Sequence, residues 1–260
     1  MSNELEYLEI AITEVCNLNC KACSHFSPLA NAGDRVTLEK FRADIRRVKE
    51  LFSVIFTIRL LGGEPLMHDD WAEMAHYVRW LYPKSRVTIV TNGLLLPQIS
   101  AEKLDLIAQD NIEFDISLYK PTVALRDTIE CVCAAHGIKC KYTNPIETFR
   151  VRFDPAGNHD AASSYRDCVI GKACTYLYNG MLSGCPAPNT IHLYNRSFGT
   201  SISGKEDLID IHNTTMSAQE ILKKLRTELT VCRYCARVEE IPWSIAGGTP
   251  SKEDWIISGR

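Results

Sequence analysis

The sequence has no surplus of basic charge. It holds 29 lysine and arginine residues against 32 aspartate and glutamate residues, and its formal net charge at pH 7 is -3. Proteins that bind nucleic acid concentrate lysine and arginine on one surface, where these side chains neutralise phosphates. Nucleic acid is therefore not expected as a partner of this chain.

Long apolar runs are missing as well. No stretch approaches the roughly 20 apolar residues that cross a bilayer, and the N-terminal sequence MSNELEYLEI carries acidic residues where a signal peptide carries bases. We therefore expect a cytoplasmic protein with no membrane partner. Its 260 residues, 45% of them hydrophobic, are enough to bury roughly three quarters of the unfolded surface in one main domain with a smaller second unit.

Cysteine, by contrast, is abundant, with 11 residues. An odd number of cysteines cannot pair completely, and a reducing compartment keeps thiols free. These cysteines are therefore expected to be metal ligands or buried thiols. Cys131 and Cys133 in a predicted helix, and Cys140 in a predicted strand, are expected to be core thiols.

Three cysteines, Cys16, Cys20 and Cys23, follow directly on an apolar segment. Three thiolates cannot complete a four-thiolate cage, so a cubane iron-sulfur cluster bound by these three alone keeps one iron open to an outside ligand. Structural zinc needs a fourth ligand, and the nearest candidate, His25, lies awkwardly close to Cys23. The spacing favours a cluster, with a zinc knuckle or three reduced thiols as the alternatives.

Two further motifs follow at the ends of predicted strands. Residues 61–65 read Leu-Gly-Gly-Glu-Pro, and residues 91–93 read Thr-Asn-Gly. Together with the Cys-x3-Cys-x2-Cys spacing, they resemble the signature of the radical SAM superfamily. The resemblance implies a [4Fe-4S] cluster on the three cysteines and a site for S-adenosylmethionine (AdoMet). The implied AdoMet-binding residues are Gly62, Gly63, Glu64, Pro65, Thr91, Asn92 and, at the end of the next predicted strand, Ser117.

Residues beside the third cysteine extend this predicted site. Members of the superfamily often carry an aromatic residue just before that cysteine, where this chain has Ala22. Phe26 is the expected substitute for the adenine contact. His25 is expected to reach AdoMet or substrate, with a structural hydrogen bond inside the loop as the alternative.

Strand-like and helix-like segments alternate along the first 153 residues. Strands are predicted at residues 8–13, 55–61, 86–90, 112–118, 138–142 and 148–153, with amphipathic helices between them. Six strand-helix repeats predict an α/β fold with a parallel sheet. The resemblance implies a partial (β/α)6 radical SAM barrel over residues 1–153, with its site at the carboxyl ends of the strands.

The remaining residues, 154–260, have a different pattern. An irregular connection at 154–164 precedes a predicted hairpin with a turn at Asn179-Gly180, and a capping box begins a helix at Ser217. This arrangement resembles the twitch subdomain, a shortened SPASM extension that binds an auxiliary [4Fe-4S] cluster. The implied ligands are Cys168, Cys185, Cys232 and Cys235. Zinc is the main alternative, and Cys174 is a reserve ligand or a hydrogen-atom donor.

Arg150 and Arg152 lie on the sixth predicted strand. Only one of the two is expected to point inward, where it would bind an anionic substrate or receive a proton from a hydroxyl. A solvated surface arginine is the alternative for each.

The resemblance implies an enzyme in which a 5'-deoxyadenosyl radical removes hydrogen from a small polyol, sugar or aminocyclitol. Oxidation, with the auxiliary cluster as electron acceptor, is favoured over epimerisation through Cys174. A peptide-modifying enzyme is a further alternative, although the first strand starts near Leu8 and leaves no room for an N-terminal leader-binding unit. A non-catalytic iron-sulfur protein is disfavoured by the intact motifs. A flavodoxin- or ferredoxin-type protein is expected to donate electrons.

Overall fold

A computed structural model describes residues 3–256 of the chain. Its centre is an eight-stranded sheet in the order β5-β4-β3-β2-β1-β7-β8-β9, and β6 and β10 form a separate two-stranded sheet. The strands are β1 (Glu4–Thr13), β2 (Val54–Gly62), β3 (Arg86–Thr91), β4 (Glu113–Ile116), β5 (Cys140–Tyr142), β6 (Thr148–Phe153), β7 (Tyr176–Tyr178), β8 (Met181–Ser183), β9 (Ile209–Asp210) and β10 (Cys235–Pro242).

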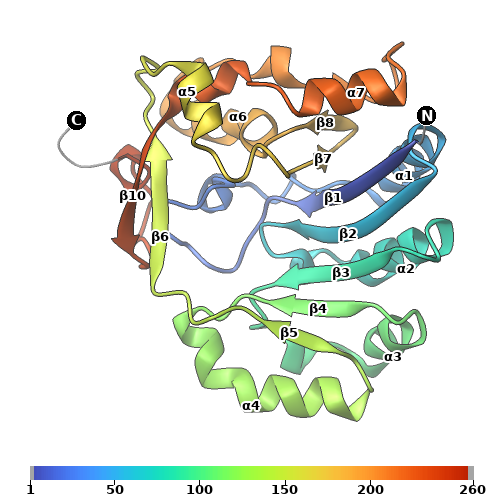
Figure 1. Cartoon of the computed structure of the whole chain (residues 1–260). Coiled ribbons are helices and arrows are strands. Elements are labelled where there is room, and N and C mark those ends of the chain that lie inside the picture. The colour runs from blue at the N-terminus through green and yellow to red at the C-terminus, as the bar shows by residue number, and fades with distance from the viewer. Residues whose placement is uncertain (1–2, 257–260) are drawn as a thin grey trace.

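Helices alternate with the first five strands, as Figure 1 shows. The α-helices are α1 (Leu38–Leu51), α2 (Trp71–Leu81), α3 (Ala101–Gln109), α4 (Lys120–Ala135), α5 (Ala161–Arg166), α6 (Ala187–Phe198) and α7 (Ala218–Leu225). Strands β1 to β5 pair in parallel with their neighbours. The predicted α/β fold with a mostly parallel central sheet is therefore confirmed.

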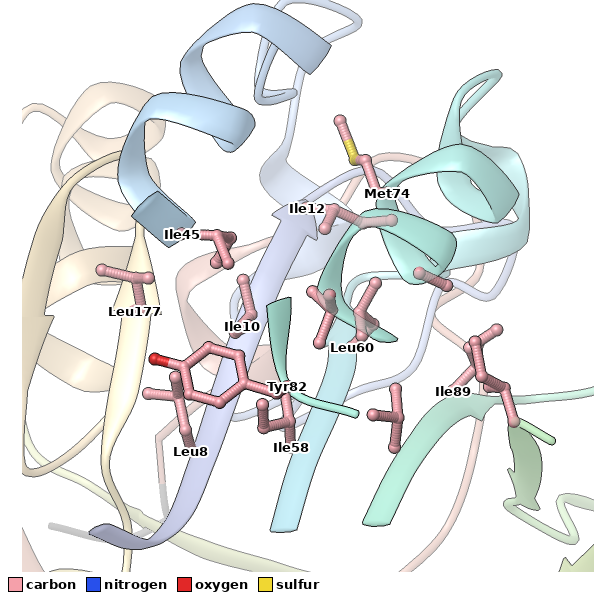
Figure 2. Packing of buried hydrophobic residues seen from close by; sticks show 14 of the residues in the cluster. Leu8, Ile10, Ile12, Ile45, Ile58, Leu60, Met74, Tyr82, Ile89 and Leu177 are labelled. Atoms are coloured by element: carbon pink, nitrogen blue, oxygen red, sulfur yellow. The ribbon is translucent and has the colours of Figure 1, made fainter. Parts of the chain in front are cut away.

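The hydrophobic core lies between this sheet and its helices. Leu8, Ile10 and Ile12 alternate along β1 and point to one face of the sheet, where they pack with Ile45 of α1 and Met74 of α2 (Figure 2). All five side chains are at most 2% exposed. The residues of β1 that lie between these three therefore point to the opposite face of the sheet.

The prediction of a sixth barrel strand is wrong about the partner of that strand. Residues 148–153 do form β6, but β6 pairs antiparallel with β10 and not with β5. A parallel strand needs a crossover of about a dozen residues or more, and the connection 143–147 is too short to supply one. Its backbone instead crosses the carboxyl end of β4, where Ile146 N donates to Leu118 O at 2.9 Å. The β6–β10 pair therefore stands at the carboxyl ends of the parallel strands (Figure 1).

The predicted hairpin is present as β7 and β8. Asn179 and Gly180 in its turn have φ values of 49° and 80°, and a type I' turn needs positive φ at both positions. Strand β7 pairs in parallel with β1. The hairpin, which was expected within the C-terminal unit 154–260, is thus hydrogen-bonded into the main sheet.

All eleven cysteines are free. Cys133 is buried and Cys140 is half-buried, whereas Cys131 is exposed, so the expectation of a core thiol is wrong for Cys131. Successive residues of a helix face different directions, and Cys131 lies on the solvent side of α4.

None of the helices within residues 3–256 combines the length and the apolar character of a membrane span.

Candidate functional site

The first cysteine set lies in the loop that follows β1. Cys20 is buried, and Cys16 and Cys23 are half-buried. Burial raises the pKa of the Cys20 thiol to about 11, against the opposing hydrogen bond from Trp243, and the nearby Cys23 raises it further. Burial also raises the pKa of Cys16, with smaller contributions from Glu64, Cys23 and Cys20. The three sulfurs are therefore close enough to interact.

This donor set fits an iron-sulfur cluster better than a single ion. Within residues 3–256, no three His, Cys, Asp or Glu side chains converge as ligands of one metal ion. A [4Fe-4S] cluster makes a different demand, because each thiolate binds its own iron. Cys16, Cys20 and Cys23, which are buried or half-buried thiols in one loop, meet that demand.

Gly62 and Gly63 bring the end of β2 against the cysteine loop. A Cβ on Gly62, whose φ is +140°, would lie 1.9 Å from Thr13 O, and a Cβ on Gly63 would lie 2.4 Å from Val15 O. Glycine is needed here because two backbone segments approach each other closely. From the sequence, both glycines were expected as AdoMet-binding residues. The two glycines fix the cysteine loop onto the sheet.

Gly63→Ala is expected to lower the free energy of unfolding by about 3 kcal/mol, at the upper end of the cost of overpacking, because the new Cβ meets rigid backbone. Chemical denaturation of the cluster-free protein measures this. Gly33→Ala is the matched control, since a Cβ there has nothing within 4 Å, and its effect should stay within about 0.5 kcal/mol. Equal stability of the two variants would contradict this account of the loop.

Glu64 is fully buried, with 0% of its surface exposed. Its carboxylate accepts hydrogen bonds from Thr91 Oγ1 at 2.6 Å, Asn92 N at 2.8 Å and Leu66 N at 3.1 Å. Burial raises its pKa to about 7, although these three bonds oppose the shift. A carboxylate offers about four acceptor positions, so one remains for a ligand cation.

The Thr-Asn-Gly segment after β3 is connected to the cysteine loop. Thr91 and Asn92 are buried, and Asn92 Nδ2 donates to Asn17 Oδ1 at 2.6 Å. Pro65 begins a short 3-10 helix after Glu64, and Ser117 N donates to Thr91 O at 2.9 Å. The residues predicted to bind AdoMet are thus brought together at one end of the sheet.

His25 belongs to a buried network that the sequence did not reveal. Tyr176 Oη donates to Glu14 Oε1 at 2.8 Å and lies 3.3 Å from His25 Nδ1. Glu14 is 0% exposed, and its Oε2 lies 3.6 Å from His25 Nδ1. Burial lowers the pKa of His25, but the interaction with the neighbouring Glu14 carboxylate outweighs this effect and raises the pKa.

Phe26 is 3% exposed and sits in an aromatic cluster. Its ring centroid lies 5.4 Å from Phe153, 5.5 Å from Tyr194 and 5.8 Å from Trp255. Phe26 also contributes to the wall of the cavity described next. The adenine contact of Phe26 remains a prediction.

A cavity of about 810 Å³ lies beside the cysteine loop. Its wall includes Cys23 and the whole of the second predicted set, namely Cys168, Cys185, Cys232 and Cys235. These four come from the segment after α5, the end of β8, and the connection into β10. Burial raises the pKa of Cys185, and the charges of the other three cysteines contribute, so the four sulfurs lie near one another.

Cys174 stands apart from this set. It is 5% exposed, is absent from the residues that line the cavity, and its Sγ donates to Glu9 Oε2 at 3.5 Å. It packs with Ala11, Leu61 and Tyr176, on the face of the sheet opposite to the main core. Burial raises the pKa of Cys174, and the charges of Glu9 and Cys185 contribute, so its role as a reserve ligand remains a prediction.

Of the two arginines on β6, only Arg152 reaches the second cysteine set. Its Nη1 donates to Cys168 Sγ at 3.2 Å, while Arg150 is 61% exposed and lies 3.6 Å from Glu240. Both line the cavity. A guanidinium stays protonated in proteins, so neither is suited to accept a hydroxyl proton, whereas the same wall also carries the carboxylates of Glu147 and Glu240.

The C-terminal segment covers the first cysteine loop, which no sequence pattern signalled. Lys21 N donates to Ser244 O at 3.0 Å, and Ala246 N donates to Asn19 O at 2.7 Å. Trp243 Nε1 donates to Cys20 Sγ at 3.3 Å. This segment, residues 243–246, is called the C-terminal strap below.

Comparison with known proteins defines the class to which this site belongs. Residues 10–129 match the Radical SAM superfamily, and the chain therefore contains a radical SAM domain. Its fold is shared over nearly the whole chain with BtrN, whose crystal structure in complex with AdoMet and 2-DOIA covers 90% of this chain and 94% of BtrN, at a TM-score of 0.54 and 16% identity.

Among curated proteins, two relatives each match less than half of the chain. Molybdenum cofactor biosynthesis protein 1 of Bos taurus is 37% identical over 116 residues, which are 42% of this chain and 17% of the bovine protein. The GTP 3',8-cyclase of Sulfurovum sp. is 27% identical over 120 residues, which are 46% of this chain and 36% of the cyclase. The chain spans about a third or less of the length of these relatives.

Proposed function

We propose that this chain is a radical SAM enzyme that removes a hydrogen atom from a small polyol, sugar or aminocyclitol and oxidises it. Cys16, Cys20 and Cys23 would hold a [4Fe-4S] cluster, which when reduced would supply the electron for cleavage of AdoMet to methionine and a 5'-deoxyadenosyl radical. The radical SAM domain and the arrangement of the motifs at one end of the sheet support this chemistry.

The residues around the cysteine loop would hold AdoMet. Glu64 has one acceptor position left for the ammonium group of its methionine moiety, as a charge-assisted hydrogen bond. Asn92 holds the loop through Asn17, and the buried end of the sheet excludes water. His25, whose pKa is raised by the neighbouring Glu14 carboxylate, lies in the same loop.

The cavity is the observation that supports the proposed substrate class and the proposed oxidation. It has room for a monosaccharide-sized molecule, it touches Cys23, and all four cysteines of the second set line it. We propose that these four bind an auxiliary [4Fe-4S] cluster of the twitch type, which accepts the second electron of the oxidation. Arg150 and Glu240 would bind substrate hydroxyls, and Glu240 would take the proton.

Two other functions remain as alternatives. An epimerase would need a hydrogen-atom donor, and the thiol of Cys174, which lies beside Glu9 but away from the cavity wall, gives it less support. The similarity to the GTP 3',8-cyclase covers less than half of this chain and about a third of the cyclase, and it therefore supports the shared chemistry without indicating GTP as the substrate.

The test uses anaerobically reconstituted, reduced protein with AdoMet and a panel of carbon-deuterated sugars, polyols and aminocyclitols. We expect deuterium to appear in 5'-deoxyadenosine with at least one of these compounds, together with a carbonyl product two mass units lighter than its substrate when both are unlabelled. GTP and short peptides serve as comparison substrates. Transfer from GTP or a peptide alone would contradict the proposed substrate class.

A further inference from the structure

Trp243 contacts the first cysteine set from the C-terminal strap. Its indole Nε1 donates to Cys20 Sγ at 3.3 Å. Cys20 also forms an isolated β-bridge with Ile245 of the strap. The hydrogen bond is therefore made where the strap backbone is itself paired with the loop.

Several contacts fix the orientation of the indole. The backbone N of Trp243 donates to Glu147 O at 2.8 Å, and its ring lies 5.5 Å from the ring of Tyr119 at an interplanar angle of 34°. Phe149 packs at 6.0 Å on Tyr119. A side chain held from both the backbone and the ring points its N–H at the sulfur with little freedom to turn away.

We propose that Trp243 is a redox-positioning residue, whose N–H bond to Cys20 raises the reduction potential of the cluster on Cys16, Cys20 and Cys23. The inference rests on the proposed function, since it requires that cluster. Hydrogen bonds to the cysteine sulfurs are one of the factors that set iron-sulfur potentials. An N–H donor favours the reduced state because that state places more negative charge on the sulfurs.

The step concerned is a one-electron transfer. An electron from a reductant such as titanium(III) citrate converts the [4Fe-4S]2+ core to [4Fe-4S]+, and no bond forms or breaks. The neutral indole adds no charge of its own. Trp243 thus makes the cluster easier to reduce without introducing a cation at the site of AdoMet.

Trp243→Phe tests the proposal, because phenylalanine preserves an aromatic ring beside Tyr119 and removes only the donor. The reduced fraction of the cluster is measured by EPR during a potentiometric titration, using the signal that changes on addition of AdoMet. At a fixed potential, the ratio of reduced to oxidised cluster should fall about tenfold, which is about 59 mV for a one-electron couple.

Trp255→Phe is the matched control. Trp255 Nε1 donates at 2.9 Å to the backbone carbonyl of Cys23 and not to a sulfur. The same tryptophan-to-phenylalanine substitution, at a residue that contacts the same cysteine loop, therefore removes a hydrogen bond without removing an N–H···S contact. The potential of this variant should stay at that of the parent, and an equal fall in both variants would overturn the proposal.

A second measurement needs no variant. With 15N-labelled tryptophan in the parent protein, pulsed EPR of the reduced cluster should show a coupling to one indole nitrogen, and its absence would overturn the inference. A parent protein that binds no cluster on Cys16, Cys20 and Cys23 would overturn both this inference and the proposed function. A cluster whose potential is unchanged in Trp243→Phe would overturn this inference alone.

Discussion

Replacing Cys16, Cys20 and Cys23 together by alanine should halve the iron of the reconstituted protein and reduce formation of 5'-deoxyadenosine to the level of a protein-free blank. The parent protein should hold about eight iron atoms per chain, four in each of two cubane clusters. The second cysteine set does not include any of the three substituted residues, so its iron should remain.

The control for this variant is a second triple substitution, Cys131→Ala, Cys133→Ala and Cys140→Ala. These cysteines belong to neither set, and they lie in α4 and β5. Iron content and AdoMet cleavage should remain those of the parent. Full cleavage activity in the variant of the first set, or an equal loss in the control, would contradict the assignment of the AdoMet-binding cluster.

The second large effect is expected from Cys232→Ala combined with Cys235→Ala. Both residues line the cavity with Cys168 and Cys185, and a cluster that loses two of four thiolates is not expected to persist. The variant should still cleave AdoMet, but it should form no oxidised product, because the second electron has no acceptor.

Cys174→Ala is the matched control, since Cys174 is a buried thiol that precedes β7 and is not among the residues that line the cavity. This variant should retain the oxidised product. Two results together would instead identify an epimerase that uses this thiol. The parent would place deuterium from heavy water on a single inverted carbon, and Cys174→Ala would still make 5'-deoxyadenosine but no inverted product.

Local sequence patterns were sufficient to predict most of the radical SAM domain. A helix was expected between the first two strands, and α1 lies there, with the side chain of Thr37 accepting from Lys40 N at its start. Alternating apolar residues located β1, and positive φ at Asn179 and Gly180 accompanies the expected hairpin turn. Each of these features depends on residues a few positions apart, which is the range over which periodicity and capping act.

Features that depend on distant pairing were not predictable. Strand β6 was identified as a strand, but its partner, β10, lies more than 80 residues further along. The hydrogen bond from Trp243 to Cys20 joins residues 223 positions apart, and Tyr176 meets Glu14 across 162 positions. The sequence indicated which cysteines carry chemistry, whereas the residues that tune their surroundings became visible only with the fold.

Radical chemistry with AdoMet is tested most directly by the fate of AdoMet in the reduced, cluster-loaded protein without substrate. We expect slow, stoichiometric formation of 5'-deoxyadenosine and methionine, and we expect neither product when the reductant is omitted. Formation of S-adenosylhomocysteine, or unchanged AdoMet beside an intact and reducible cluster, would contradict this expectation.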